Sequence, residues 1–180
     1  SAASNAIAAL GRIYSTLSHA QTILAKGADL AAEVDADYEA LIKAASQKVE
    51  EAFNDDINTP VVIAQIFEMI RSFNASYKPG QKITPKIFYR AKAFTMWVNH
   101  IGRVMSLFVR EPNTYLQALD NHLLAERNIV REDVDALVTA RTEARSKKDF
   151  SKADEIRKKL DELKISVQDT PEGTVWEVQK

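Results

Sequence analysis

The apolar pattern of this chain changes its period once, after Lys164, and that change strongly limits how its last forty residues can fold. Before Lys164, apolar residues recur every three or four positions, as one buried helix face requires. This stripe consists of Phe150, Ala153, Ile156, Leu160 and Leu163. After Lys164 the period drops to two, with Ile165, Val167 and Asp169 on one face and Thr174, Trp176 and Val178 alternating likewise. The sequence therefore predicts a helix followed by a β-hairpin.

The residues between the two expected strands favour a tight turn. In the segment 170–173, Pro171 fixes φ at the second turn position and Gly173 accepts a positive φ at the fourth. We therefore expect a bulged type I turn. An isolated hairpin is marginal in water, so it must pack on the helices that precede it. Residues 130–180 are expected to form a small α+β unit of two helices and a terminal β-hairpin.

Four apolar stripes of helical period precede this unit, over residues 6–24, 38–53, 63–77 and 87–108. Gly27 is expected to end the first helix, and Thr59 and Pro60 to be the N-cap and first residue of the third. Four such helices with short connections are typical of an antiparallel bundle. We expect a mainly α chain, with a four-helix bundle at 1–110 and a linker at 111–129. That linker should contain one helical turn between Tyr115 and Leu124.

Composition excludes several classes of function. The 180 residues include no Cys, which excludes disulfides and thiolate chemistry. No apolar run approaches the roughly 20 residues that a membrane span needs, and the first residues do not resemble a signal peptide. We expect a cytoplasmic chain without a membrane partner. Because it begins with Ser rather than Met, we expect it to be a piece of a longer protein.

The net charge of −1 conceals a strong asymmetry. Residues 29–56 carry nine acids and two bases, residues 71–110 carry eight bases and no acid, and residues 141–164 carry nine bases and six acids. A basic stripe without compensating acids is typical of a nucleic-acid-binding surface. Alternatively, the basic segment packs beside the acidic one and is neutralised by it. Charge alone does not decide between these two interpretations.

We find no pattern that predicts catalysis in this chain. His19, His100 and His122 have no partner at metal-ligand spacing, and five glycines do not form a phosphate-binding loop. Asp55 and Asp56 could act as an acid/base pair, but acids just before Thr59-Pro60 are better explained by the positive end of a helix. We therefore expect neither a metal nor a cofactor in this chain, and a stand-alone enzyme finds no support.

Binding is the remaining function. Arg145, Lys147 and Lys148 precede Phe150 at a helix junction, and an aromatic ring among cations suits an RNA loop, since a base can stack on it. Alternatively, Phe150 is a staple at the start of the last helix. In that case Asp149 or Ser151 is the N-cap, and the segment 151–154 matches a capping box.

Two motifs carry a resemblance to a known family. The first is Ala144-Arg-x-x-Lys-Asp-Phe-x-x-Ala-Asp-x-x-Arg157, followed by Asp169-x-Pro-x-Gly-Thr-x-Trp176; the second is Asp55-Asp-Ile-Asn-Thr-Pro60. Together they resemble the tRNA-binding part of cysteinyl-tRNA synthetase over nearly the whole chain, from Ala6 to Val178. The chain departs from the family at Ile57, where Phe is usual, at Phe150, where Trp is common, and at Val104–Phe108, where a Leu-Gly-Leu-Leu run is common.

The resemblance implies a class I enzyme that ligates cysteine to its tRNA using ATP, with a zinc ion holding the cysteine thiolate. The motifs of that catalytic domain, His-x-Gly-His and Lys-Met-Ser-Lys-Ser, are not in this sequence. ATP and zinc are therefore implied for the parent protein only. The resemblance implies a DALR-like bundle and an anticodon-binding unit, with cysteine tRNA as partner and a monomeric state. The competing interpretation is a helical protein–protein interaction module with a basic face.

The resemblance also implies which residues contact tRNA. The family's anticodon-binding positions fall on Arg145, Phe150, Asp154 and Asp169, and secondary contacts fall on Arg141, Lys148, Arg157 and Trp176. A carboxylate only accepts hydrogen bonds, so both acids suit the N–H donors of guanine, cytosine or adenine. Their alternative roles are structural: an N-cap contact for Asp154 and a turn-initiating side chain for Asp169. Trp176 suits the core as well as it suits a contact.

Overall fold

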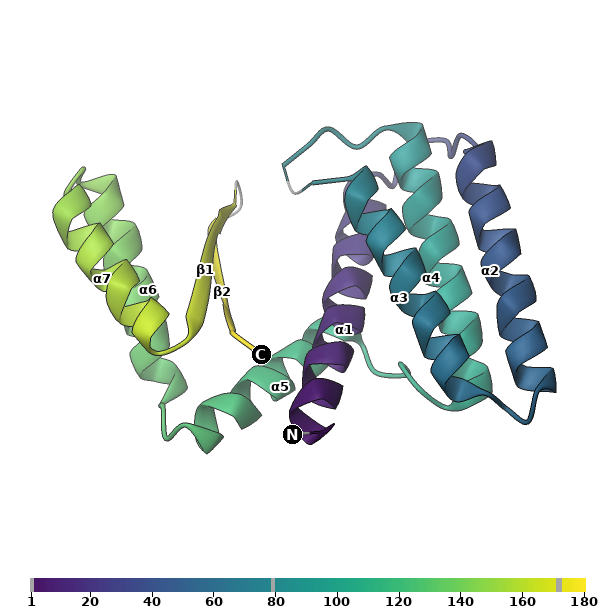
Figure 1. Ribbon diagram of the computed structural model, residues 1–180. Helices are drawn as coiled ribbons and strands as arrows, with labels where there is room; N and C mark the ends of the chain where they lie inside the picture. The colour runs from purple at the N-terminus through teal and green to yellow at the C-terminus, as the bar shows by residue number, and fades with distance from the viewer. Residues whose placement is uncertain (1, 79, 171–172) are drawn as a thin grey trace. The chain divides into compact units, whose positions relative to one another are not determined.

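The computed structural model describes residues 2–78, 80–170 and 173–180. In these residues the chain forms seven helices and one two-stranded antiparallel sheet (Figure 1). The elements are α1 (Ala2–Lys26), α2 (Ala36–Asn54), α3 (Thr59–Ser76), α4 (Pro85–Met105), α5 (Pro112–Glu126), α6 (Arg131–Ser146), α7 (Phe150–Glu162), β1 (Ile165–Thr170) and β2 (Gly173–Val178). They divide into two compact units, unit 1 ending at Thr114 and unit 2 beginning at Tyr115.

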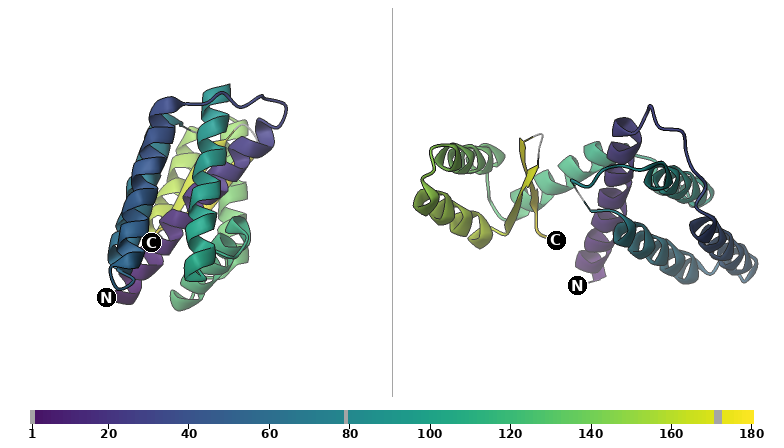
Figure 2. Two further views of the ribbon diagram at one scale, coloured as in Figure 1. Left: turned by 90° about the vertical axis from the view of Figure 1, so that its right-hand side faces the viewer. Right: turned by 90° about the horizontal axis from the view of Figure 1, so that it is seen from above.

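Unit 1 is an antiparallel four-helix bundle, which confirms the predicted mainly α class. Successive helices from α1 to α4 run in opposite directions (Figure 1), and the right-hand view of Figure 2 looks nearly along α2, α3 and α4. Phe73 of α3 and Phe94 of α4 stack with ring centroids 4.9 Å apart in the core. The indole N–H of Trp97 donates to Ser46 Oγ at 3.0 Å and so ties α4 to α2.

The helix ends of unit 1 follow local side-chain chemistry. Asp35 caps α2 by accepting the Tyr38 N–H at 3.1 Å, and Gly27 follows α1 as predicted. The prediction that Thr59 is the N-cap of α3 is wrong by one residue. Asn58 holds that position, because its carbonyl already accepts the N–H groups of Val61 and Val62. Pro60 is therefore the second residue of α3 and not the first as predicted, although it still lies in the first turn.

The end of α4 shapes the segment that follows it. Ser106 adopts left-handed backbone angles (φ 56°), and the Leu107 N–H donates to Gly102 O at 2.8 Å. This folds residues 106–110 back over the last turn of the helix. A Cβ on Gly102 would lie 2.6 Å from Leu107 O, so the close approach requires a glycine.

Residues 112–126 form the full helix α5, and the prediction of a linker with one helical turn is wrong. The carboxylate of Glu111 accepts the N–H groups of Asn113 (3.1 Å) and Thr114 (2.7 Å), which satisfies two free donors of the first turn. Pro112 suits a first helical position, so it begins the helix instead of interrupting it. Leu119, Leu123 and Leu124 are buried.

Unit 2 contains the predicted helices and hairpin. In the observed register, Ile165, Val167 and Asp169 pair with Val178, Trp176 and Thr174, which confirms the predicted alternation. Gly173 has the expected positive φ, 135°. The predicted turn type depends on residues 171–172 and lies outside the described residues.

The last residues of the hairpin fasten it to the helices of unit 2. Ile165 and Val178 are fully buried, and the Val178 N–H donates to Asp120 Oδ1 on α5 at 3.2 Å. Lys180 Nζ lies 3.7 Å from the same carboxylate, and Arg127 donates to Gln179 O at 2.7 Å. The hairpin thus packs on preceding helices, as its marginal intrinsic stability requires.

Candidate nucleic-acid interface

The predicted cationic cluster lies at the α6–α7 corner, residues 145–150. Asp149 N donates to Ala144 O at 2.9 Å and Lys148 N to Arg145 O at 3.0 Å, which closes the end of α6. Lys148 occupies the left-handed position (φ 60°) where glycine is usual. Arg145, Lys147 and Lys148 are all exposed. Lys147 Nζ lies 3.9 Å from the Glu143 carboxylate, whereas Lys148 forms no ion pair within the described residues. The corner therefore presents cations to solvent.

Phe150 follows this corner as the first residue of α7. Asp149 is the N-cap, accepting the Lys152 N–H at 3.1 Å, which decides between Asp149 and Ser151. Phe150 is 62% exposed, so the prediction that it belongs to the buried stripe is wrong. The stripe begins one turn later, at Ala153. A staple would bury this ring, and the observed exposure does not fit that alternative.

Phe150 shares its helix face with two other predicted site residues. Asp154 and Arg157 follow it at four and seven positions, a spacing that places all three on one side of α7. All three are exposed, and Ala153, Ile156 and Leu160 form the buried side. The exposed side of α7 therefore offers an aromatic ring, a carboxylate and a guanidinium to the same ligand.

Asp169 is the centre of a hydrogen-bonded group that we call the Asp169 cluster: Arg141, Arg145, Asp169 and Thr174. Arg141 binds the carboxylate with two parallel bonds, from Nη1 to Oδ1 (2.9 Å) and from Nη2 to Oδ2 (3.0 Å). Thr174 Oγ1 donates to Oδ1 at 3.0 Å, and Arg145 donates to Oδ2. The hydrogen bonds from Arg141, then that from Thr174 and the charges of both arginines, lower the pKa of Asp169 to about 2.

This geometry assigns different positions to the predicted residues of the cluster. The Arg141 side chain is only 6% exposed, whereas those of Arg145 and Asp169 are 49% and 41% exposed. Four donors occupy the roughly four lone-pair sites of the Asp169 carboxylate. A base N–H could reach this carboxylate only by displacing one of these donors. Arg145 is the more exposed of the two arginines and would therefore be displaced more easily than Arg141.

Trp176 lies at a different place on unit 2. Its indole N–H donates to Asp135 Oδ1 at 2.8 Å, and the Arg131 guanidinium lies 4.4 Å from the ring centroid, in cation–π contact. The side chain is half-buried. The sequence did not single out Thr174, Arg131 or Asp135 as partners of predicted site residues. Of these, Thr174 was detectable, because strand alternation already placed it on the face of Asp169.

The two interpretations of the basic segment in unit 1 each fit some of its residues. Arg90 pairs with Asp35 at 2.7 Å and Lys86 with Glu33 at 3.6 Å, so part of the segment is neutralised by the acidic one. Within the described residues no ion pair involves Lys82, Lys92, Arg103 or Arg110, and all four are exposed. Half of the basic segment therefore stays available to a polyanion.

Residues 2–78, 80–170 and 173–180 contain no group of three or more His, Asp or Glu side chains that could hold a metal ion. None of the helices in these ranges has the length and apolar character needed to cross a membrane.

Comparison with known families follows the same two-unit division. A family model described as the cysteinyl-tRNA ligase anticodon binding domain matches residues 127–176, and one described as the DALR domain matches residues 48–110. The chain belongs to the cysteine–tRNA ligase family. The first match covers the α6–α7 corner and the Asp169 cluster, and the second covers α3, α4 and much of α2.

Curated relatives support the assignment over the full chain. It is 44% identical to the cysteine–tRNA ligase of Bdellovibrio bacteriovorus over 99% of its length. The proteins of the same name from Geobacter metallireducens and Desulfovibrio desulfuricans are 35% and 33% identical, over 96% and 95% of the chain. The chain spans 36% of the length of each of these three relatives.

Proposed function

We propose that this chain binds tRNA, and that unit 2 contacts the anticodon of cysteine tRNA. The observation that carries the proposal is the 62% exposed ring of Phe150 beside the cations of the α6–α7 corner, within the segment similar to an anticodon-binding domain. An unstacked base of the RNA can stack on the ring of Phe150, and the neighbouring phosphates can pair with Lys148 and Arg157. These side chains are all exposed, so binding needs no rearrangement of the fold.

The candidate residues divide by their chemistry. Phe150 supplies the stacking surface, and Lys148 and Arg157 supply charge without sequence preference. Asp154 has an exposed carboxylate that accepts base N–H groups. Arg145 contacts the RNA while Asp169 holds it in place. Arg141, which is buried, supports both. Trp176 can contact the RNA only with the part of its ring that Arg131 does not cover.

The parent activity that we propose is ATP-dependent ligation of cysteine to its tRNA. Zinc and ATP would serve that reaction in the parent protein. Residues 1–110 would act as the DALR-like bundle and residues 130–180 as the anticodon-binding unit. Helix α5 occupies most of the 111–129 stretch between them. We propose a monomer that works in the cytoplasm.

The proposal is tested with a cysteine tRNA transcript and a second transcript that has the same body and a different anticodon. Phe150→Ala should weaken binding of the cysteine transcript by roughly 5- to 100-fold, the effect of losing one stacked base. Val175→Ala is the matched control, since Val175 is an apolar side chain of unit 2 with 53% exposure. The wild-type affinity should also fall linearly with log salt concentration.

Two results would contradict this proposal. If the wild type binds both transcripts with equal affinity, the anticodon is not part of the interface. Affinity that does not depend on salt, or on Phe150, would favour the alternative of a protein-interaction module. Because Phe150 is exposed, its truncation should leave the thermal unfolding midpoint unchanged, and the same samples verify this.

A further inference from the structure

A groove of about 720 Å³ lies on unit 1 between α2, α4 and the connector 27–35 that precedes α2. One face of α4 forms a wall of this groove, through Tyr89, Ala93, Met96, His100 and Arg103. Spacings of three and four residues keep these side chains on the same side of the helix. At 1.5 Å per residue the wall is roughly 21 Å long, so the groove matches a helix of about four turns. The proposed function makes no use of it.

Large apolar side chains gather in this groove and stay exposed. Val34 of the connector and Met96 of α4 are 57% and 62% exposed, and both line it. Ile42 of α2 and the ring of Trp97 line it too, and Trp97 is held there by its hydrogen bond to Ser46. A single exposed apolar side chain is ordinary, but several in one hollow mark an interaction site. The flexible Met96 side chain can adapt to the surface of a partner.

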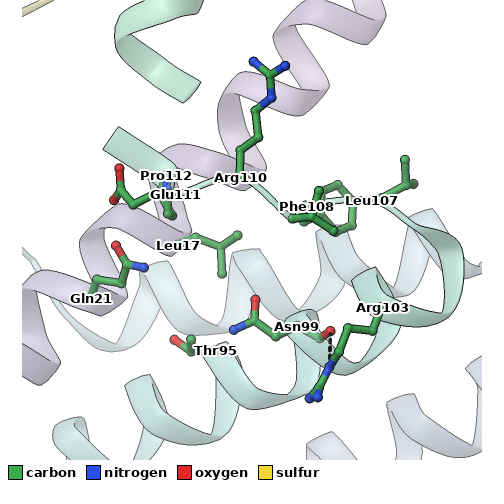
Figure 3. Close-up of a pocket in the computed structure, with 11 residues that line it drawn as sticks. Leu17, Gln21, Thr95, Asn99, Arg103, Leu107, Phe108, Arg110, Glu111 and Pro112 are labelled. Atoms are coloured by element: carbon green, nitrogen blue, oxygen red, sulfur yellow. Dashed lines mark hydrogen bonds between the residues drawn. The ribbon is translucent and has the colours of Figure 1, made fainter. Parts of the chain in front are cut away.

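The margin of the groove carries positive charge that no acid of the described residues neutralises. Lys92 and Arg103 line the groove, both are exposed, and neither forms an ion pair within those residues. Figure 3 shows the Arg103 guanidinium turned away from a separate cavity between α1, α4 and the segment 107–112, and its Nε donates to Asn99 O at 3.4 Å. Glu39 also lines the groove, but its carboxylate already accepts a hydrogen bond from the Tyr89 hydroxyl. Carboxylates of a partner would therefore complement Lys92 and Arg103.

We propose that an amphipathic helix of the parent protein packs in this groove, with its apolar face on Val34 and Met96 and its carboxylates beside Lys92 and Arg103. An apolar groove flanked by charge is a usual receptor for such a helix, whereas RNA phosphates would meet an apolar floor. The chain spans 36% of the length of the relatives compared above, so most of a parent of that length lies outside it.

A helix that belongs to the same protein has an advantage over a separate partner. Its tether gives it an effective concentration on the order of mM, so a groove of modest size is enough to hold it. Interfaces between domains of one chain are also more polar than obligate interfaces, which fits an apolar floor with charged margins. The inference rests on the proposed function in one respect, namely that the chain is part of a longer ligase.

Thiol labelling gives a direct test, because the 180 residues contain no Cys. Val34→Cys places one thiol in the groove, and peptide mapping by mass spectrometry reads its labelling in both the 180-residue chain and the full-length parent. We expect this thiol to react at least about tenfold more slowly in the parent, since a packed helix leaves it accessible only while the interface is open. Equal labelling rates in the two proteins would overturn the inference.

A second substitution locates the protection in the groove. Met96→Glu puts a carboxylate against the apolar face of the helix, so it should return the labelling of Val34→Cys in the parent to the rate of the 180-residue chain. Val104→Glu is the matched control, since Val104 is 58% exposed on the same helix and does not line the groove. It should leave the labelling slow. If Met96→Glu does not restore labelling, or Val104→Glu restores it equally, the groove is not the contact and the inference is overturned.

The cysteine tRNA transcript serves as the competing occupant. Added to the 180-residue chain, it should leave the labelling of Val34→Cys unchanged. Protection by the transcript, with equal labelling of the chain and the parent in its absence, would assign the groove to RNA and overturn the inference. The proposed function is judged separately: a chain that binds the transcript through Phe150 while the parent leaves Val34→Cys unprotected refutes this inference alone. A parent that protects the thiol while the chain does not bind the transcript refutes the proposed function alone.

Discussion

Replacement of Asp169 by Asn measures how much the Asp169 cluster contributes to stability. The substitution preserves the shape of the side chain and removes the charge that Arg141 and Arg145 share. The lowering of the pKa of Asp169 from 3.8 to about 2 would correspond to about 2.4 kcal/mol for a fully shielded group. The side chain is 41% exposed, so solvent screening reduces this to about 1 kcal/mol. The unpaired charge left on buried Arg141 adds about 1 kcal/mol, giving a loss near 2 kcal/mol.

Urea unfolding can follow unit 2 separately. The chain has two tryptophans, Trp97 in unit 1 and Trp176 in unit 2. A Trp97→Phe background therefore leaves Trp176 as the reporter of the hairpin. Arg141→Met in the same background completes a double-mutant cycle, and we expect a coupling free energy of at least about 1 kcal/mol. A cost below about 0.5 kcal/mol for Asp169→Asn, or strict additivity with Arg141→Met, would refute the reasoning.

The pH dependence of the same pair gives an independent check. The folded-state pKa of Asp169 lies below its unfolded value, so its contribution is complete above about pH 4 and is lost as pH falls toward 2. Over this window the free energy of unfolding should fall by about 1 kcal/mol more in the wild type than in Asp169→Asn. Other carboxylates titrate in both proteins and cancel in the difference. Parallel pH profiles would contradict the assigned pKa.

Two further predictions concern backbone geometry. Lys148 and Lys164 both hold left-handed angles (φ 60°), so Lys148→Gly and Lys164→Gly should each stabilise unit 2 by about 0.5–1 kcal/mol in urea. Only Lys148→Gly should also reduce the slope of log affinity against log salt, by roughly 0.7; equal slopes in the two variants would remove Lys148 from the RNA interface. Gly102→Ala should destabilise unit 1 by about 1–3 kcal/mol, followed by Trp97 fluorescence in a Trp176→Phe background, because a Cβ would meet Leu107 O at 2.6 Å. An alanine variant as stable as the wild type would show that residues 106–110 are not held against α4.

Periodicity was sufficient to predict the helices of the bundle, α6, α7 and both strands, because each buries one regular face. It was not sufficient for α5. There Leu116, Leu119 and Leu123 do recur at helical spacing, but the polar residues among them and Pro112 favour a linker with a single helical turn. The missed signal was Glu111, whose carboxylate satisfies the first N–H groups of that helix.

The candidate sites show a similar division. The motif predicted which residues gather at the α6–α7 corner, but not that Arg141 and Arg145 would converge on Asp169. That contact depends on how the hairpin packs on α6, which no local pattern specifies. The sequence also did not predict the cavity of about 540 Å³ that α1, α4 and the segment 107–112 form in unit 1. Gln21 and Asn99 are polar residues on separate helices, and only the packing of α1 beside α4 brings them to one space.

The bond between Val178 and Asp120 has a consequence for synthesis of the chain. These two residues are 58 positions apart, and at 5–20 residues per second a ribosome needs roughly 3 to 12 s to add the second after the first. During this interval the Asp120 carboxylate of α5 lacks the backbone N–H that donates to it in the finished fold. The bundle of unit 1 is complete earlier and can fold as a separate domain. Nascent chains stalled a few residues before Val178 should therefore carry a native bundle and an unfinished unit 2, and this is the form that chaperones would meet.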